Sequence, residues 1–360
     1  MATTEPNILL ILTDQQRTDT LGFRGQTPCR TPNMDRIANE GISFDRAICA
    51  SPLCLPSRAA IFTGQYPHQI NMMQNSDTLR VEPTLTDRLR ARGYYTAYAG
   101  KWHLEPHGGS KAFRGRQREL GVERFAGEPE APKGSRVIDG WFDDAEGQSS
   151  IDYSDWCEDN GLPDGWPVAD PDVRTHRTPS MTTPRTKAQD LPSDKTYDAW
   201  VTDIALRYLH ERPRDRPFFL VSSWFGPHPP FLIPEPYYGM YDPADVPEPA
   251  NFLPGPDKPR SNTTSFYHQL WLDHGDDWEA WKKTVAVYWG YVTMLDGLVG
   301  RLLEALEENG ILDDTLVIFA SDHGEMLGSH GLWHKMVPYE ECLRVPLLMR
   351  CPGRIRPGVR

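Results

Sequence analysis

One segment of the chain combines a cysteine with features that bind oxyanions. Residues 54–64 are CLPSRAAIFTG, in which Pro56 suits a first helical turn and the following residues continue the helix. This places Cys54 at a predicted helix N-terminus, where unpaired N–H groups and the helix dipole favour an anion. Arg58 adds a guanidinium group that fits sulfate or phosphate oxygens. Such a cysteine is expected to be acidic and reactive, unless it is one of the common buried structural cysteines.

Further polar residues follow four short apolar runs that are predicted to be strands. In open α/β sheets ligands bind beyond the carboxyl ends of the strands, so these residues are expected to converge on one crevice. Taken singly, each group is also what an ordinary strand-to-loop junction contains. The groups are Asp14 and Gln15 after residues 7–12, Lys101 and His103 after 95–99, His228 after 218–224, and Asp322 and His323 after 315–320.

The elements around these residues indicate an α/β fold. Short apolar runs alternate with amphipathic segments, which is typical of a mostly parallel sheet covered by helices. Residues 105–195 and 226–265 lack sustained periodicity and are predicted to be long surface excursions that shape substrate access. Helices are expected over residues 31–40, 84–92, 197–211 and 284–309, the last from apolar residues at three- and four-residue steps.

Composition excludes several classes of protein. With 38 basic and 50 acidic residues the net charge is −12, which disfavours general affinity for nucleic acid or anionic membranes. The apolar run near the start is too short for a signal segment or a membrane span, so a cytoplasmic protein is expected. Six scattered cysteines without a CxxC pair favour reduced thiols.

At this point the chain resembles the sulfatase family of the alkaline phosphatase superfamily. CLPSRAAIFTG matches the family signature, and PNILLILTDQQ, GKWHL, GPHPPF, SDHGEMLG and HGLWHK follow in the family's order. The DQ and DH pairs look most like the phosphonate monoester hydrolase and choline sulfatase branches. The resemblance covers residues 1–360 as one catalytic domain. It implies an α/β/α sandwich around a mostly parallel sheet, and it predicts that the family's C-terminal subdomain is absent from this chain.

The resemblance also implies a modification and a metal. A separate maturation enzyme would convert Cys54 to formylglycine, whose hydrate is the family's nucleophile, whereas Cys49 lacks the Pro-Ser-Arg sequence and should be ignored. Gln15 stands where many sulfatases have a second aspartate. The implied ligands of one divalent metal are Asp14, Gln15, Cys54 after modification, Asp322 and His323. Ca²⁺ is expected, and this less charged, nitrogen-containing set makes Mn²⁺ or Mg²⁺ competitive.

The remaining active-site positions of the family are matched by Arg58, Lys101, His103, His228 and Lys335. By resemblance, the three cationic side chains would neutralise the sulfate oxygens. His228 would protonate the leaving group, and His103 would take a proton from the hydrate so that sulfate is expelled. His330 and His334 are interpreted as residues that only shape the pocket.

Hydrolysis of a small anionic sulfate ester is therefore the expected function. Two alternatives stay open: a phosphonate monoester or phosphodiester hydrolase on the same scaffold, and a truncated, non-catalytic anion-binding protein. A homo-oligomer is compatible with the sequence.

Overall fold

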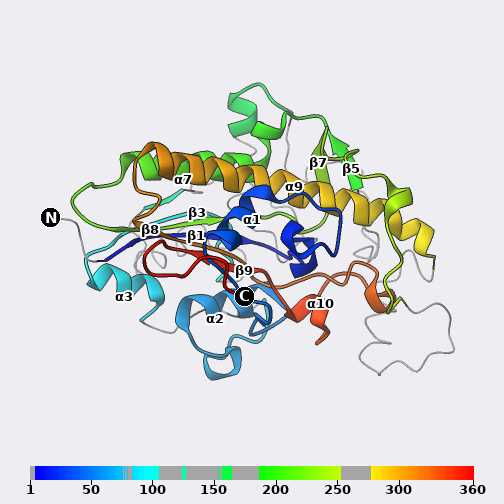
Figure 1. Ribbon diagram of the computed structural model, residues 1–360, viewed down its shortest axis with the longest axis horizontal. Coiled ribbons are helices and arrows are strands. Elements are labelled where there is room, and N and C mark those ends of the chain that lie inside the picture. Colours follow the sequence, from blue (N-terminus) through cyan, green and yellow to red (C-terminus); the bar gives the residue numbers. More distant parts are fainter. Residues whose placement is uncertain are drawn as a thin grey trace, which may run out of the picture.

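The computed structural model (Figure 1) has a seven-stranded sheet at its centre. The strand order is β2-β9-β8-β1-β6-β3-β4. The structure describes residues 5–104 except 76, 78 and 80–82, together with 124–126, 153, 156–163, 186–252 and 277–360. All statements about the fold refer to these residues.

The sheet is mostly parallel, as predicted. β1 lies between β6 and β8 and is parallel to both, and β3 continues the parallel order between β6 and β4. Only β9 runs antiparallel, to β8 on one side and to β2 on the other. The strands are β1 (Asn7–Thr13), β2 (Ile42–Ser43), β3 (Tyr95–Gly100), β4 (Arg124–Ala126), β6 (Phe218–Ser223), β8 (Thr315–Ser321) and β9 (Leu347–Arg350).

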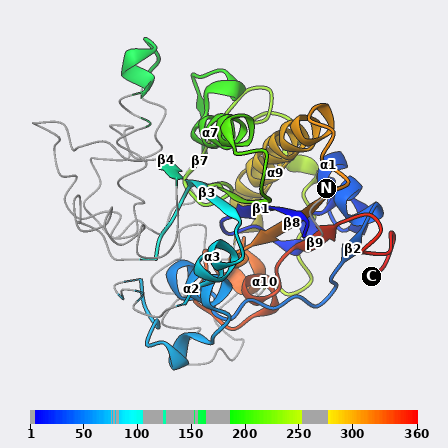
Figure 2. The same ribbon diagram turned by 90° about the vertical axis from the view of Figure 1, so that its left-hand side faces the viewer.

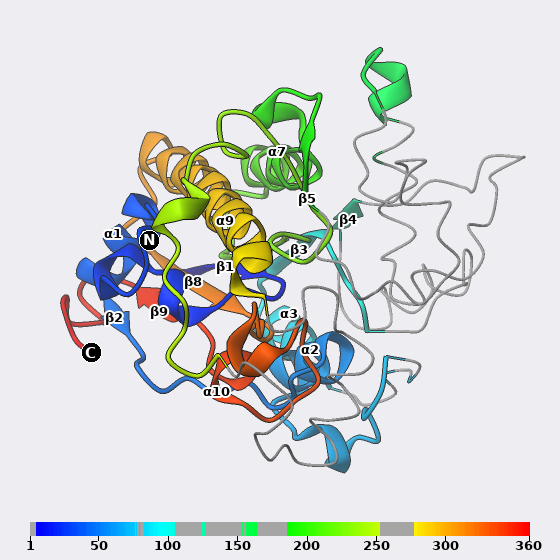
Figure 3. The same ribbon diagram turned by 90° about the vertical axis from the view of Figure 1, so that its right-hand side faces the viewer.

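Helices cover both faces of this sheet. Figures 2 and 3 show α7 (Tyr197–Glu211) and α9 (Trp278–Glu308) over one face, with α2 (Cys54–Thr63) and α3 (Leu85–Ala91) over the other. The side chains of β1 alternate between the two layers. Leu9 and Ile11 belong to the core that contains α7 and α9, whereas Leu10 belongs to the core that contains residues of α2. A strand covered on both faces is apolar at nearly every position, which explains the continuous run at 8–12.

The four predicted helices and four predicted strands are all confirmed. The helix predicted over 31–40 is α1 (Pro32–Asn39), and the last one, α9, begins six residues before the expected start at 284. The Asp277 side chain accepts a hydrogen bond from the Glu279 N–H and caps that earlier end. Within the described ranges, none of the helices combines the length and apolarity needed to cross a bilayer.

Parts of the two predicted excursions lie within the described residues. β5 (Thr186–Gln189) and β7 (Phe231–Pro234) pair in parallel as a separate two-stranded sheet that contacts α9. The prediction of irregular structure was therefore wrong at β7 in 226–265 and at β4 and β5 in 105–195, because strands of three or four residues are too short to show a period. Much of both excursions, including Trp141 and Trp166, lies outside the described residues. Trp156 is described, and its ring stacks on Tyr153 at 5.8 Å.

Candidate active site

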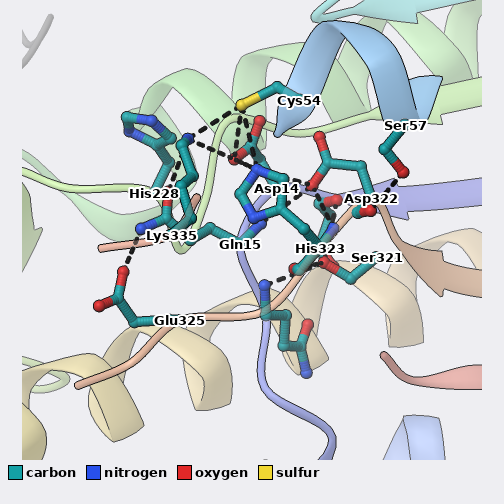
Figure 4. A network of polar contacts seen from close by, with 12 residues as sticks. Asp14, Gln15, Cys54, Ser57, His228, Ser321, Asp322, His323, Glu325 and Lys335 are labelled. Atoms are coloured by element: carbon teal, nitrogen blue, oxygen red, sulfur yellow. Dashed lines mark hydrogen bonds and ion pairs between the residues drawn. The ribbon is translucent and has the colours of Figure 1, made fainter. Parts of the chain in front are cut away.

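The carboxyl ends of the parallel strands bring the predicted site residues together. Leu12 of β1 lies in register with Ser223 of β6 and Ala320 of β8, so the residues that follow these strands meet at one edge of the sheet. The first residue of α2, Cys54, faces the same edge, as Figure 4 shows. The predicted helix N-terminus at Cys54 is confirmed. The predicted convergence is confirmed for six residues: Asp14, Gln15, Lys101, His228, Asp322 and His323.

Four buried side chains form a group that could hold a metal ion. One potential ligand atom from each of Asp14, Cys54, Asp322 and His323 lies within 4.8 Å of every other. His323 Nδ1 lies 2.9 Å from the Gly324 carbonyl oxygen. A carbonyl only accepts, so Nδ1 carries the proton and Nε2 faces the group with a lone pair. Burial lowers the pKa of His323, which keeps the ring neutral. This set of carboxylate, imidazole and sulfur atoms fits a divalent cation.

Gln15 borders this group. Its backbone has φ 68°, and its N–H donates to Asp322 Oδ1 at 3.2 Å. Its side-chain oxygen accepts a hydrogen bond from Lys335 Nζ at 2.9 Å, and the same ammonium group lies 2.9 Å from Cys54 Sγ. The Gln15 oxygen therefore lies beside the candidate ligands, at the place where an additional neutral ligand is expected.

Buried cations surround the carboxylates. Lys101 Nζ contacts Asp14 Oδ2, and Lys335 Nζ lies 4.0 Å from Asp14 Oδ1. Burial opposes the ionisation of Asp14, but the two lysines outweigh it and hold the pKa of Asp14 well below its usual value. The site therefore contains an ionised carboxylate with two ammonium groups beside it, all nearly inaccessible to solvent.

Arg58 connects the two carboxylates to the sheet. Its Nε donates to Asp322 Oδ2 at 2.7 Å, and one terminal nitrogen donates to Ser223 Oγ at 2.8 Å and to the Lys101 carbonyl at 2.9 Å. The other terminal nitrogen lies 3.5 Å from Asp14 Oδ2. The guanidinium group therefore binds protein oxygens in this structure and orients Asp14 and Asp322.

The expectation that Cys54 is an acidic thiol was wrong. Burial, together with Asp14, raises the pKa of Cys54 to about 12, and the lysines do not compensate. A helix N-terminus alone would lower the pKa of the thiol. The neighbouring carboxylates raise it, and they could not be foreseen because they come from distant parts of the sequence. The unmodified thiol is therefore a weak nucleophile at neutral pH, since the thiolate is the reactive form.

The histidines occupy different places. His228 is buried, and its Nδ1 lies 2.6 Å from the Pro229 carbonyl, which fixes the proton on that nitrogen. Burial and Lys335 lower the pKa of His228 well below its usual value. Figure 4 shows His228 beside Lys335. His103 is buried two residues after Lys101 and has φ 50°.

Two contributors to the site were not singled out from the sequence, and a third was given only a minor role. Ser223 supports Arg58, Glu325 contacts the Gln15 amide, and His334 Nδ1 lies 3.3 Å from Gln15 Nε2. His334 was interpreted only as a residue that shapes the pocket. The sequence offered one signal for Glu325. This acidic residue lies only two positions after His323 and is followed by the apolar residues Met326 and Leu327.

Comparison with known proteins identifies the family. The sulfatase family model matches residues 6–360. The chain is 31% identical to an arylsulfatase from Clostridium perfringens, over 98% of this chain and 70% of that protein. It is 27% identical to a choline-sulfatase from Rhizobium meliloti, over 100% of this chain and 65% of the relative. The chain thus spans about two thirds of the length of these relatives.

The fold agrees with this assignment. The crystal structure of a phosphonate monoester hydrolase from Agrobacterium radiobacter matches with a TM-score of 0.72 at 26% identity, over 97% of this chain and 68% of that one. The alkaline-phosphatase-like fold expected from the sequence is confirmed. The signature around Cys54, the strand-end cluster and the matches over nearly the whole chain lead to one conclusion: the chain belongs to the sulfatase family of sulfuric ester hydrolases.

Proposed function

We propose that this chain hydrolyses a small sulfate monoester at the Cys54 cluster, with one divalent cation and with formylglycine formed from Cys54 by a maturation enzyme. The observation that carries the proposal is the position of the Cys54 sulfur. It lies 3.1 Å from His323 Nε2 and 2.9 Å from Lys335 Nζ, within the group that contains Asp14 and Asp322. Potential metal ligands and an ammonium group therefore meet at the atom that the family signature marks.

The cations supply the charge that the reaction needs. A sulfate monoester is an anion, and negative charge moves onto its oxygens and the leaving oxygen as the ester bond breaks. Lys101 and Lys335, buried beside Asp14, would hold the non-bridging oxygens in a site of low dielectric constant. Arg58 would hold Asp14 and Asp322 in place through the contacts described above. Arg58, Lys101 and Lys335 thus place three positive charges at the site, although the net charge of the chain is −12.

Asp14, Gln15, Asp322 and His323 would hold the cation, together with the group derived from Cys54. Bound there, a divalent cation acts as a Lewis acid and lowers the pKa of a coordinated hydroxyl group. Ca²⁺ suits the carboxylate oxygens, whereas the neutral Gln15 oxygen and the His323 nitrogen also accommodate Mn²⁺ or Mg²⁺.

His228 would supply the proton for the leaving oxygen. Its Nδ1 proton is held by the Pro229 carbonyl, so the transferable proton would be carried on Nε2. The low pKa of His228 means that the ring is neutral in the structure. An anionic substrate adds negative charge nearby and raises that pKa, so substrate binding would charge the ring. His103, close to Lys101 in the chain, would accept a proton from the second hydroxyl of the formylglycine hydrate, so that the aldehyde forms again and sulfate is expelled.

Matched aryl esters test the proposal. If a sulfate ester is the substrate, we expect kcat/KM for an aryl sulfate to exceed that for an aryl phosphonate monoester with the same leaving group by about tenfold or more, because an enzyme binds the transition state of its own substrate more tightly. The structural likeness to a phosphonate monoester hydrolase makes that activity the second candidate. A preference for the phosphonate would replace the sulfatase assignment. Lack of turnover on both esters by metal-loaded protein would favour the anion-binding alternative.

A further inference from the structure

Glu325 is a buried carboxylate that the proposed reaction does not use. It lies two residues after His323 and its exposed fraction is 0%. Three N–H donors converge on it: Leu327 N at 3.0 Å and His334 N at 2.6 Å bind Oε1, and Gln15 Nε2 contacts Oε2. Figure 4 shows Glu325 on the side of Gln15 that faces away from Cys54. The carboxylate therefore accepts three hydrogen bonds, one of which comes from a candidate metal ligand.

The contacts of Gln15 give its amide group a defined direction. A glutamine amide has nearly the same shape after a half-turn, so its hydrogen-bond partners decide which end carries the oxygen. The nitrogen end faces the Glu325 carboxylate and lies 3.3 Å from His334 Nδ1. The oxygen end faces Lys335 Nζ, which also contacts Cys54. Only the oxygen end can coordinate a cation, so the half-turn would remove Gln15 as a ligand.

We propose that Glu325 is a positioning residue that turns the oxygen of the Gln15 amide toward the cation site. The inference rests on the proposed function, because it takes the Cys54 cluster as the cation site. Glu325 accepts the N–H groups of Leu327 and His334 with one oxygen and the NH₂ end of Gln15 with the other, which leaves the Gln15 oxygen for the cation. The backbone N–H groups of Leu327 and His334 hold the carboxylate itself in place.

Glu325→Gln tests this arrangement with almost no change in shape. The new amide has one oxygen for the three donors that Glu325 accepts. In either orientation its NH₂ group therefore faces at least one N–H group and no acceptor. If the amide nitrogen faces Gln15, the Gln15 amide must turn or separate. We expect the affinity for Mn²⁺ and for Ca²⁺, each measured by calorimetry, to fall by about 10- to 100-fold, the usual loss for a residue that orients a metal ligand.

The double variant Gln15→Glu with Glu325→Gln is the rescue. It exchanges the donor and the acceptor across the same contact and leaves the net charge unchanged. The new carboxylate accepts from the new amide and still presents an oxygen to the cation, while Leu327 N and His334 N keep an acceptor. We expect the double variant to bind Mn²⁺ more tightly than either single variant. Gln15→Glu alone places two carboxylates in contact and is expected to bind weakly or to be destabilised.

Asp322→Asn separates this inference from the proposed function. Loss of Mn²⁺ binding in that variant locates the cation at the cluster; unchanged binding would mean that the proposed site itself is wrong. With the cation located, binding by Glu325→Gln within about twofold of the wild type overturns the positioning role. So does a double variant that binds no better than Glu325→Gln. If circular dichroism shows Glu325→Gln unfolded, the double variant decides alone, and its failure to bind Mn²⁺ while folded overturns the inference.

Discussion

Cys54→Ala is expected to lower kcat on an aryl sulfate by about a thousandfold or more, because removal of a nucleophilic residue typically has an effect of this size. Alanine occupies less space at the buried first position of α2 and keeps the helix. The thermal unfolding curve should therefore remain cooperative. Steady-state kinetics on metal-loaded protein, with circular dichroism of the same samples, measures both results.

Cys49→Ala is the matched control for this experiment. Cys49 lies five residues earlier, its sulfur contacts the Cys342 carbonyl at 3.6 Å, and it is not one of the four side chains of the candidate metal group. This variant should keep nearly the wild-type rate. Nucleophilic catalysis by Cys54 is excluded if Cys54→Ala retains more than about a thousandth of the wild-type rate.

Asp14→Asn is expected to have the second large effect. Asp14 is a candidate metal ligand and is also the carboxylate nearest to Lys101 and Lys335. Removing its charge leaves the buried ammonium groups with less negative charge nearby. Breaking a buried ion pair in this way lowers the free energy of unfolding by about 3–5 kcal/mol. Addition of Mn²⁺ or Ca²⁺ should raise the melting temperature of the wild type and not that of the variant, because only bound ligand stabilises the folded state.

Asp203→Asn provides a matched substitution at the surface. Asp203 also pairs with a cation, Arg301 at 2.5 Å, but both side chains are more than a third exposed. Its loss should change the unfolding free energy by less than about 1 kcal/mol and leave the thermal shift by metal intact. Equal destabilisation of the two variants, or a normal metal shift in Asp14→Asn, would contradict the role given to Asp14.

The main elements of the fold could be predicted because local patterns determine them. The strand at the start of the chain is covered on both faces, so nearly all its residues are apolar, and α7 was predicted with the bounds that the structure has. β7 was missed, because it is short and its pairing with β5 is a tertiary contact. The early start of α9 was missed because its cap at Asp277 lies before the apolar residues whose spacing predicts the helix.

The candidate metal ligands were predictable from the sequence, but their supporting residues Ser223 and Glu325 and the electrostatics of the site were not. Strand ends and the Cys54 signature identify the members of the cluster, since a parallel sheet brings these ends together. The pKa of Cys54, the engagement of Arg58 and the contact between Glu325 and Gln15 depend on side chains that are far apart in the sequence. The direction of the pKa shift and the partners of these side chains depend on burial and on distances in the folded chain, which the sequence does not contain.

Mass spectrometry of the peptide that contains Cys54 tests the central claim most directly. The protein should be purified from a host able to make formylglycine, and its turnover of an aryl sulfate should be measured on the same sample. We predict an aldehyde in place of the thiol at residue 54, with the fraction converted rising in proportion to kcat across preparations. Full activity in a preparation whose residue 54 is entirely unmodified cysteine would contradict the account.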